Sequence, residues 1–344
     1  MQSLWHGTVT LDPTGSRQSH ASSLLVHGDH VLVAWFEGSH EGSPDTRVML
    51  ARGSLDGSFG EARVVAPAPT PHWNPVLATG PDGRVWLFFR RGPRIDTWTT
   101  WVCRSDDAGA TWSGAVELVP GDASGGRGPV RQAPVPYAGA WVAPGSVEVW
   151  SEPPVWDSFV DVWTPSGTWR RVDLPLDHAG FRGAGSIQPA LVVGGRGQLV
   201  ALTRSTGGAV LRSETSDRYR WPPLRPCGLP NNNSGLAAVS LPNGRLACVH
   251  NSATEDWGSR ARLVVSTSGD DGLTWASGAV LEDRSGEAGG RPAAAAASGV
   301  VTTGEGEFSY PSARVVGDEL WVTYTWQRRG IALTRVPLDL LAGE

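Results

Sequence analysis

Six apolar segments recur along the chain, and each follows a turn that contains a glycine. Apolar residues follow one another in these segments without a helical period, and Gly, Pro, Asn and Asp bound them, which is typical of short β-strands. The segments are residues 27–36, 81–89, 137–145, 195–204, 242–251 and 316–326. Their turn glycines are Gly28, Gly83, Gly139, Gly197, Gly244 and Gly317, with spacings of 55, 56, 58, 47 and 73 residues. The pattern predicts a β-protein built from repeated units.

An eight-residue pattern, S-x-D-x-G-x-T-W, repeats in step with these segments. It occurs at Ser105–Trp112 and at Ser268–Trp275, and shorter versions end at Phe59, Trp169 and Trp221. The aromatic residues that end the five copies are 53, 57, 52 and 54 residues apart. Ser and Asp side chains hydrogen-bond the backbone of tight turns, Gly supplies a positive φ, and Trp packs between neighbouring units. We therefore interpret the motif as a structural turn without a catalytic role.

Repeats of fifty-odd residues with four short strands per unit predict β-propeller blades, because each blade buries its faces against its neighbours. Six glycine turns predict six blades. Since only five aromatic turns are present, we expect the N-terminal strand to complete the sixth blade by pairing with the C-terminal strands. The predicted fold is all-β, a single six-bladed β-propeller domain of four-stranded antiparallel blades over residues 1–344. The alanine-rich stretch 293–297 predicts a loop or a short helical turn within an insertion.

Charge and composition exclude several classes of partner. The chain has 29 Lys and Arg against 34 Asp and Glu, a net charge of -5, and its arginines are scattered, so we expect no nucleic-acid partner. No apolar run approaches the roughly 20 residues that span a bilayer, and the first residues resemble no signal peptide, so we expect a cytoplasmic protein without membrane association. Cys103, Cys227 and Cys248 lie far apart without metal-ligand spacing, which favours a reducing compartment, no metal and no cofactor. The oligomeric state stays open.

Two sets of mainly polar residues are predicted to ring one mouth of the axis, because the innermost strand of a blade begins at the face where the second strand ends. Seven to eleven residues before the turn glycines stand His20, Asn74, Arg131, Gln188, Asn233 and Tyr310. Seven residues after them stand Trp35, Arg90, Ser146, Arg204, Asn251 and Tyr324. Arg, Asn and Gln suit a sugar, whose hydroxyls need fixed hydrogen-bonding groups and whose carboxylate needs guanidinium groups. The predicted substrate-binding residues are Arg90, Arg131, Arg204, Asn74, Gln188, Asn233 and Asn251.

The turn motif and several longer segments resemble one protein family along nearly the whole chain. S-x-D-x-G-x-T-W resembles the Asp-box of the sialidase (BNR repeat) superfamily. The segments 72–90, 126–135, 186–193, 231–251 and 306–329 are similar to those of bacterial sialidase-like proteins whose substrates are mostly unassigned. The resemblance implies the propeller fold firmly and the substrate only loosely.

The family's catalytic residues transfer only in part. In sialidases three arginines hold the substrate carboxylate, a tyrosine backed by a glutamate is the nucleophile, and a loop aspartate is the acid/base. The resemblance places the nucleophile at Tyr310 and one of the arginines at Arg204. It places His20 where the first arginine is expected, and Gln188, which cannot act as a base, where the supporting glutamate is expected.

Other residues offer replacement chemistry. The loop after residue 36 is expected to bring Glu41 and Asp45 to the mouth, where either could be the general acid. Glu307 could activate the Tyr310 phenol or act as a second carboxylate, and His20 could assist the phenol or serve as the acid/base. We also expect a set of tryptophans near the mouth, where they can stack on sugar faces. They are Trp73, Trp98, Trp150, Trp257 and Trp326.

Three functions remain open from the sequence. The first is a sialidase-like glycoside hydrolase that acts in exo fashion on a terminal acidic or deoxy sugar, at the axis mouth of the propeller. The second is a lyase for a uronic acid, in which His20 and Tyr310 are base and acid while Arg131, Arg204 and Asn233 neutralise the carboxylate. The third is a non-catalytic carbohydrate-binding propeller. In each case the partner is a small glycoside or an oligosaccharide.

Overall fold

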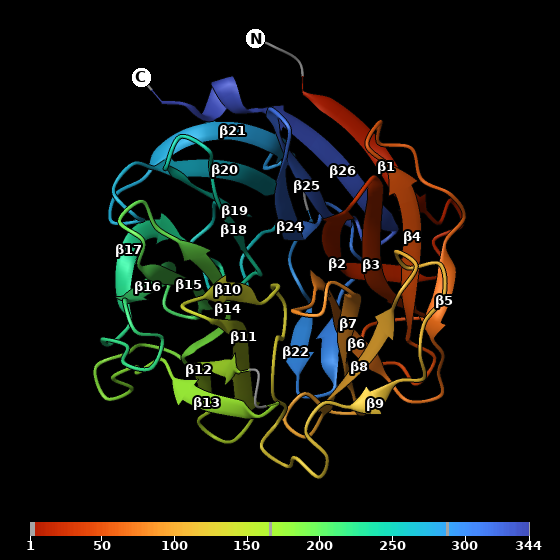
Figure 1. The fold of residues 1–344 in the computed structure, drawn as a ribbon, viewed down its shortest axis with the longest axis horizontal. Coiled ribbons are helices and arrows are strands. Elements are labelled where there is room, and N and C mark those ends of the chain that lie inside the picture. The colour runs from red at the N-terminus through yellow and green to blue at the C-terminus, as the bar shows by residue number, and fades with distance from the viewer. Residues whose placement is uncertain (1–3, 165–166, 287–288, 344) are drawn as a thin grey trace.

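The computed structural model describes residues 4–164, 167–286 and 289–343, which form a ring of β-sheets around a central axis (Figure 1). Strands account for 52% of the residues and helix for 1%, so strand pairing provides nearly all regular structure. Six sheets of four antiparallel strands are arranged as blades. The protein is a six-bladed β-propeller, which confirms the fold predicted from the sequence.

The blades follow one another along the chain, and in blades 1 to 5 the first strand is innermost. Blade 1 contains β2 (Gln18–His27), β3 (His30–Gly38), β4 (Arg47–Ser54) and β5 (Arg63–Ala66). Blade 2 contains β6 (His72–Thr79), β7 (Val85–Arg91), β8 (Thr99–Ser105) and β9 (Val116–Glu117). Blade 3 contains β10 (Val135–Tyr137), β11 (Ala140–Val149), β12 (Val155–Trp163) and β13 (Trp169–Asp173).

The second half of the ring is built in the same way. Blade 4 contains β14 (Ser186–Val193), β15 (Leu199–Ser205), β16 (Ala209–Thr215) and β17 (Arg225–Pro230). Blade 5 contains β18 (Ala237–Ser240), β19 (Leu246–Asn251), β20 (Arg262–Ser268) and β21 (Ala276–Asp283). Blade 6 contains β24 (Phe308–Val316), β25 (Glu319–Trp326), β26 (Gly330–Pro337) and β1 (Trp5–Leu11).

Blade 6 joins the two ends of the chain. Strand β1 pairs antiparallel with β26, with Trp5 opposite Arg335 and Leu11 opposite Gly330. Figure 1 shows β1 alongside β26 at the edge of the ring. The outermost strand of the last blade is therefore the first strand of the chain.

Apolar side chains fill the spaces between neighbouring blades. Trp35 of β3 and Trp321 of β25 belong to one buried cluster, so blades 1 and 6 share a core. Leu32 of β3 and Leu87 of β7 belong to another, which joins blades 1 and 2. Burial of such apolar surface is the main favourable contribution to folding, and here it also holds neighbouring blades together.

The two complete copies of the eight-residue turn motif form hairpins between the third and fourth strands of blades 2 and 5. In the first copy, Asp107 accepts hydrogen bonds from the Ser105 hydroxyl at 2.8 Å and from the Thr111 backbone and hydroxyl at 2.8 and 2.6 Å. The Gly109 N–H donates to Ser105 Oγ at 2.8 Å. The bond from Thr111 is the main cause that lowers the pKa of Asp107 to about 2. The motif closes the outer hairpin of its blade by turn chemistry.

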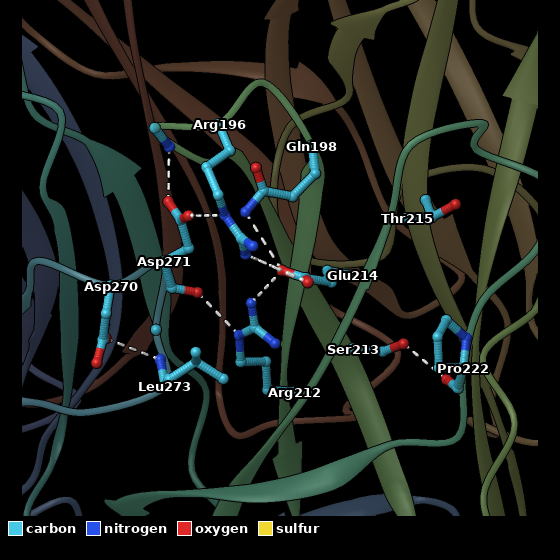
Figure 2. Close-up of polar contacts among 12 residues, drawn as sticks. Arg196, Gln198, Arg212, Ser213, Glu214, Thr215, Pro222, Asp270, Asp271 and Leu273 are labelled. Carbon is cyan, nitrogen blue, oxygen red and sulfur yellow. Dashed lines mark hydrogen bonds and ion pairs between the residues drawn. The ribbon is translucent and has the colours of Figure 1, made fainter.

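A network of charged side chains links blade 4 to the turn motif of blade 5 (Figure 2). Asp271 accepts a hydrogen bond from Arg196 Nε at 2.9 Å, and its carbonyl accepts one from Arg212 Nε at 2.8 Å. Glu214 accepts hydrogen bonds from Arg196 Nη2 at 3.1 Å, from Gln198 at 3.2 Å and from Arg212. We call these five residues the rim network.

Two elements lie outside the blades. Strands β22 (Ala294–Ala296) and β23 (Gly299–Val301) form a hairpin, and the chain ends in a short 3₁₀ helix, η1 (Leu338–Leu341). Figure 1 shows β22 inside the ring, between β11 and β7 in this view. The prediction of a loop or helical turn for the alanine-rich stretch was wrong, because its residues pair as a strand. No helix in the described part of the chain is long and apolar enough to cross a membrane.

Candidate active site

A left-handed backbone position recurs near the start of the inner strands. The angle φ is positive at Ala21 (59°), Asn74 (44°), Gln188 (52°), Asn233 (58°) and Tyr310 (54°). The strand register shifts at this point in blades 1, 2, 4 and 6, which marks a β-bulge. A bulge re-aims a side chain, and Asn74, Gln188 and Tyr310 line a cavity at the axis. The repeat aligns Ala21 with these positions, and His20 lies one residue before it.

Arg204 connects three of the predicted site residues. Its Nη1 donates to the phenol oxygen of Tyr310 at 2.5 Å and to Gln188 Oε1 at 3.1 Å, and its Nε donates to Asn233 Oδ1 at 2.7 Å. Only 3% of the surface of Arg204 is exposed, so these hydrogen bonds form away from bulk water. A buried guanidinium that donates to a phenol oxygen stabilises negative charge on that oxygen.

His20 packs directly against Tyr310. The centroids of the two rings are 4.1 Å apart, His20 Nδ1 lies 2.8 Å from Thr325 Oγ1, and Nε2 has no hydrogen-bond partner among the described residues. Burial lowers the pKa of His20 well below its usual value, and the charges of Arg328, Arg260 and two further arginines lower it more. The imidazole is therefore neutral near pH 7.

A second set of charged side chains includes Glu41, which lines the same cavity as Tyr310. We call Arg260, Arg328, Glu307 and Glu41 the axial network. Glu307 binds Arg260 Nη1 through one oxygen and Arg328 Nε through the other, both at 2.9 Å, while Glu41 binds Arg328 Nη1 at 2.5 Å. Although burial opposes the charge of Glu307, the two arginines lower its pKa to about 2. A carboxylate with so low a pKa is a weak base, and in this position it balances the arginine charges.

Arginine charge exceeds acidic charge around the phenol. The guanidinium carbons of Arg131, Arg204 and Arg260 lie 5.4, 5.6 and 5.5 Å from the centroid of the Tyr310 ring. Arg260 Nη2 and Arg328 Nη2 are buried and have no hydrogen-bond partner among the described residues. These free donors suit an anionic group, because a buried N–H group without an acceptor is costly.

Glu148 was not predicted and lines the same cavity as Tyr310. It follows Ser146 by two residues in β11, so both side chains lie on one face of the strand. Burial raises the pKa of Glu148 to about 7. A carboxyl group with so raised a pKa keeps a proton at neutral pH for part of the time and can act as a general acid.

Aromatic side chains and the β22–β23 hairpin close the cavity. Trp73, Trp98, Trp150 and Trp257 line it, as expected from the sequence, whereas Trp326 lines a different pocket between blades 5 and 6. Ala296 and Val300 of the hairpin cover it. The remaining volume is about 20 Å³, which is little more than the space of one water molecule.

Backbone contacts hold the hairpin over blades 1 and 2. The Ile95 N–H donates to the Ala297 carbonyl at 2.7 Å. Gly299 has φ of 126°, and a side chain there would meet the Glu41 carbonyl at 2.6 Å, so this close approach requires glycine. The hairpin itself has only two strands of three residues, which is a marginally stable unit on its own.

Several predicted residues do not line the cavity. Arg131 donates to the carbonyls of Ser22 at 2.9 Å and Pro311 at 2.8 Å, so it joins the inner strands of blades 1 and 6. Arg90 donates hydrogen bonds to the Thr100 hydroxyl and the Gly128 carbonyl. Asn251 donates hydrogen bonds to the carbonyls of Arg262 and Phe308. The Asp45 carboxylate accepts a hydrogen bond from the Ser39 hydroxyl and lies 3.6 Å from the Arg17 guanidinium. Trp35 and Tyr324 belong to buried apolar clusters between blades.

Among the described residues, no group of three His, Cys, Asp or Glu side chains is arranged to hold a metal ion.

Most of the chain matches the model of one protein family. Residues 29–322 match the model described as a BNR repeat-like domain. The chain belongs to the BNR repeat-like family. This confirms the resemblance to BNR-repeat proteins of the sialidase superfamily that the sequence indicated. A comparison of this BNR repeat-like protein with curated protein sequences gave no match.

Solved structures share the fold of this BNR repeat-like protein at low sequence identity. A Dyadobacter fermentans protein of unknown function is 13% identical with a TM-score of 0.74, and the match covers 97% of this chain and 99% of that one. Trypanosoma rangeli sialidase is 14% identical with a TM-score of 0.66, covering 94% of this chain and only 56% of that one. Penicillium chrysogenum α-L-arabinanase complexed with arabinobiose is 12% identical with a TM-score of 0.67, covering 98% and 99%. The fold is therefore one that glycoside hydrolases use.

Proposed function

We propose that this protein is an exo-acting glycoside hydrolase for a terminal acidic sugar, with Tyr310 as the nucleophile and the axial cavity as its site. The observation that carries the proposal is the Tyr310 phenol, which a buried bulge turns into this cavity beside the excess of arginine charge. The carboxylate of an acidic sugar would balance that charge. Its apolar ring face would stack on the tryptophan walls.

The proposed reaction retains the configuration of the sugar. The Tyr310 oxygen attacks the anomeric carbon as the phenol proton passes to His20 Nε2, and Glu148 gives its proton to the departing glycosidic oxygen. Water then attacks the anomeric carbon and breaks the tyrosyl–sugar bond, Glu148 takes the proton of that water, and His20 returns its proton to the released phenolate. Arg204 stabilises the phenol oxygen while it carries negative charge.

The substrate itself supports the base in this proposal. Burial and four arginines hold the pKa of His20 low in the free protein. A substrate carboxylate placed among those arginines offsets part of their charge, which raises the pKa of His20 and its basicity. A neutral sugar would not have this effect, which favours acidic substrates.

Entry to the site requires movement of its cover. A cavity of about 20 Å³ cannot hold a sugar ring, so the β22–β23 hairpin or the tryptophan side chains must move as the substrate binds. A cover over the axis also leaves room for a chain end but not for the middle of a polysaccharide, which supports exo action.

The decisive experiment compares hydrolysis of aryl and alkyl glycosides of sialic and uronic acids by wild type and three variants. Tyr310→Phe should lower kcat/KM about a thousandfold or more. Glu148→Gln should lower kcat/KM about 100- to 10,000-fold for alkyl glycosides, and far less for 4-nitrophenyl glycosides, whose leaving group needs no acid. Glu214→Gln in the rim network is the control and should match wild type. Full activity of Tyr310→Phe would refute the nucleophile.

A uronic-acid lyase remains the second candidate, because a neutral His20 packs on Tyr310 and no carboxylate accepts a hydrogen bond from the phenol among the described residues. Elimination produces a conjugated double bond with strong ultraviolet absorbance, whereas hydrolysis does not. Rising absorbance with acidic oligosaccharides and no released monosaccharide would replace the hydrolase proposal with the lyase.

A further inference from the structure

The propeller axis has a second hollow at the end opposite Tyr310. It has a volume of about 460 Å³, and residues from the inner strands of all six blades line it. Arg314 lies four residues after Tyr310 in β24, which places it at most about 13 Å further along the strand. This hollow is therefore separate from the proposed active site, and a volume of this size is ordinary for a small-molecule pocket.

Arg314 is the charged residue among those that line this hollow, and no acidic residue lines it with Arg314. Most of the other lining residues are apolar, including Leu25, Leu191, Val193 and Val315. The hollow thus combines an aliphatic wall with one positive charge.

The Arg314 guanidinium has little to bind within the protein. Among the described residues, its one hydrogen bond runs from Nη1 to the carbonyl of the adjacent Ala313, at 2.7 Å. Desolvation alone lowers the pKa of Arg314 to about 10, so it stays charged at neutral pH. Arg314 is partly buried, so its guanidinium faces the hollow with N–H groups that no protein acceptor occupies, and an anion in the hollow can accept hydrogen bonds from them.

The neighbouring polar side chains do not serve this role because they have partners of their own. Gln132 Nε2 donates to the Leu236 carbonyl at 2.7 Å, and Ser240 Oγ donates to the Val193 carbonyl at 2.6 Å. Free hydrogen-bonding capacity in the hollow is thus concentrated on the Arg314 guanidinium, which can bind a carboxylate through two parallel N–H groups.

We propose that this hollow is a second binding site, which takes a small organic acid with its carboxylate on Arg314 and its aliphatic body against the six inner strands. The site is independent of sugar cleavage, since its residues come from the far ends of the inner strands.

The test follows methyl signals of the full chain, labelled at Ile, Leu and Val, during titration with hexanoate and with hexanamide. Hexanoate should shift the methyl groups of Leu25, Leu191, Val193 and Val315 in a saturable way, and hexanamide should bind about tenfold more weakly because it lacks the charge. Equal affinity of the two probes, or the absence of saturable shifts at these residues, would overturn the proposal.

Two variants and a second set of signals sharpen the test. Arg314→Gln should lower hexanoate affinity to the level of hexanamide, and Arg314→Lys, which keeps the charge, should retain most of it. The hexanoate shifts should persist in Tyr310→Phe. Shifts confined to Ile95 and Val300, which lie at the Tyr310 end, would contradict a second site. The comparison of the two probes on wild type stands even if Arg314→Gln fails to fold.

Discussion

The rim network and the axial network use the same chemistry in two different environments. Each contains two arginines and two carboxylates. At the rim, the side chains of Arg196 and Glu214 are 63% and 33% exposed. At the axis, those of Arg260 and Glu307 are each 1% exposed. Water screens the first pair and is excluded from the second, so identical groups contribute little to stability in one place and become indispensable in the other.

The two networks also differ in role: one joins neighbouring blades, and the other lies near the proposed nucleophile. The rim network ties blade 4 to the outer hairpin of blade 5, where the loss of one contact leaves others and water in its place (Figure 2). The axial network has no such replacement. Its unpartnered donors are on Arg260 and Arg328, and the Arg260 guanidinium carbon lies 5.5 Å from the ring centroid of Tyr310, which we propose as nucleophile.

The largest effect on stability is expected for Glu307→Gln. This variant leaves the buried charges of Arg260 and Arg328 without their shared carboxylate, so the free energy of unfolding should fall by about 3–5 kcal/mol. Urea unfolding followed by tryptophan fluorescence measures it. A loss below about 1 kcal/mol would mean that the two networks are equivalent and that burial is not decisive.

Acid should remove the stabilisation that the Glu307 carboxylate provides in wild type. Glu307 has a pKa of about 2 in the folded protein against 4.5 as the usual value, so the unfolded chain binds the proton more tightly. The stabilisation, about 3 kcal/mol, is complete above about pH 5 and is lost as pH falls from 4.5 through 2. Unfolding free energies of wild type and Glu307→Gln should therefore converge between pH 6 and pH 2.5. A constant difference over this range would contradict the assignment.

Glu41→Gln should have an intermediate effect, because Arg328 keeps its bond to Glu307. We expect a loss of about 1–3 kcal/mol in the free energy of unfolding. Glu41 and Glu307 share Arg328, so the double variant should depart from the sum of the single variants. Strict additivity in the urea measurements would show that the four groups do not act as one network.

The smallest effect is expected for Glu214→Gln at the rim. The loss should be at most about 1 kcal/mol, and it should shrink further at about 1 M salt, where charges are screened over about 3 Å. Unfolding measured at low and high salt tests this. A large loss of unfolding free energy that does not depend on salt would show that the rim network stabilises the fold as the axial network does.

The sequence predicted the fold more completely than the site. Six turn glycines gave the blade number, and the Asp107 motif could be recognised as a turn from its chemistry alone. Tyr310 and Arg204 were found because the start of an inner strand and the end of a second strand can be counted from those glycines.

Other site features depend on details that the repeat does not fix. Glu148 lies nine residues after its turn glycine because β11 extends further than the average second strand, and counting seven residues ended at Ser146. The alternation of Ser146 and Glu148 was the available signal. Arg260 and Arg328 lie in loops of different blades, and only the closed ring brings them to one carboxylate. The hairpin over the site was missed because an alanine-rich stretch has little strand preference of its own.

The pairing of β1 with β26 sets a waiting time for the nascent chain. At about 5–20 residues per second, roughly 16–64 s pass between synthesis of Leu11 and synthesis of its partner Gly330. During that interval blade 1 and its neighbours can assemble, but the interface between blades 1 and 6 is open, and β1 has an unpaired edge that can join a foreign strand. The same closure that removes free edges from the finished ring makes its first strand the last to be secured, so aggregation during synthesis should depend on β1.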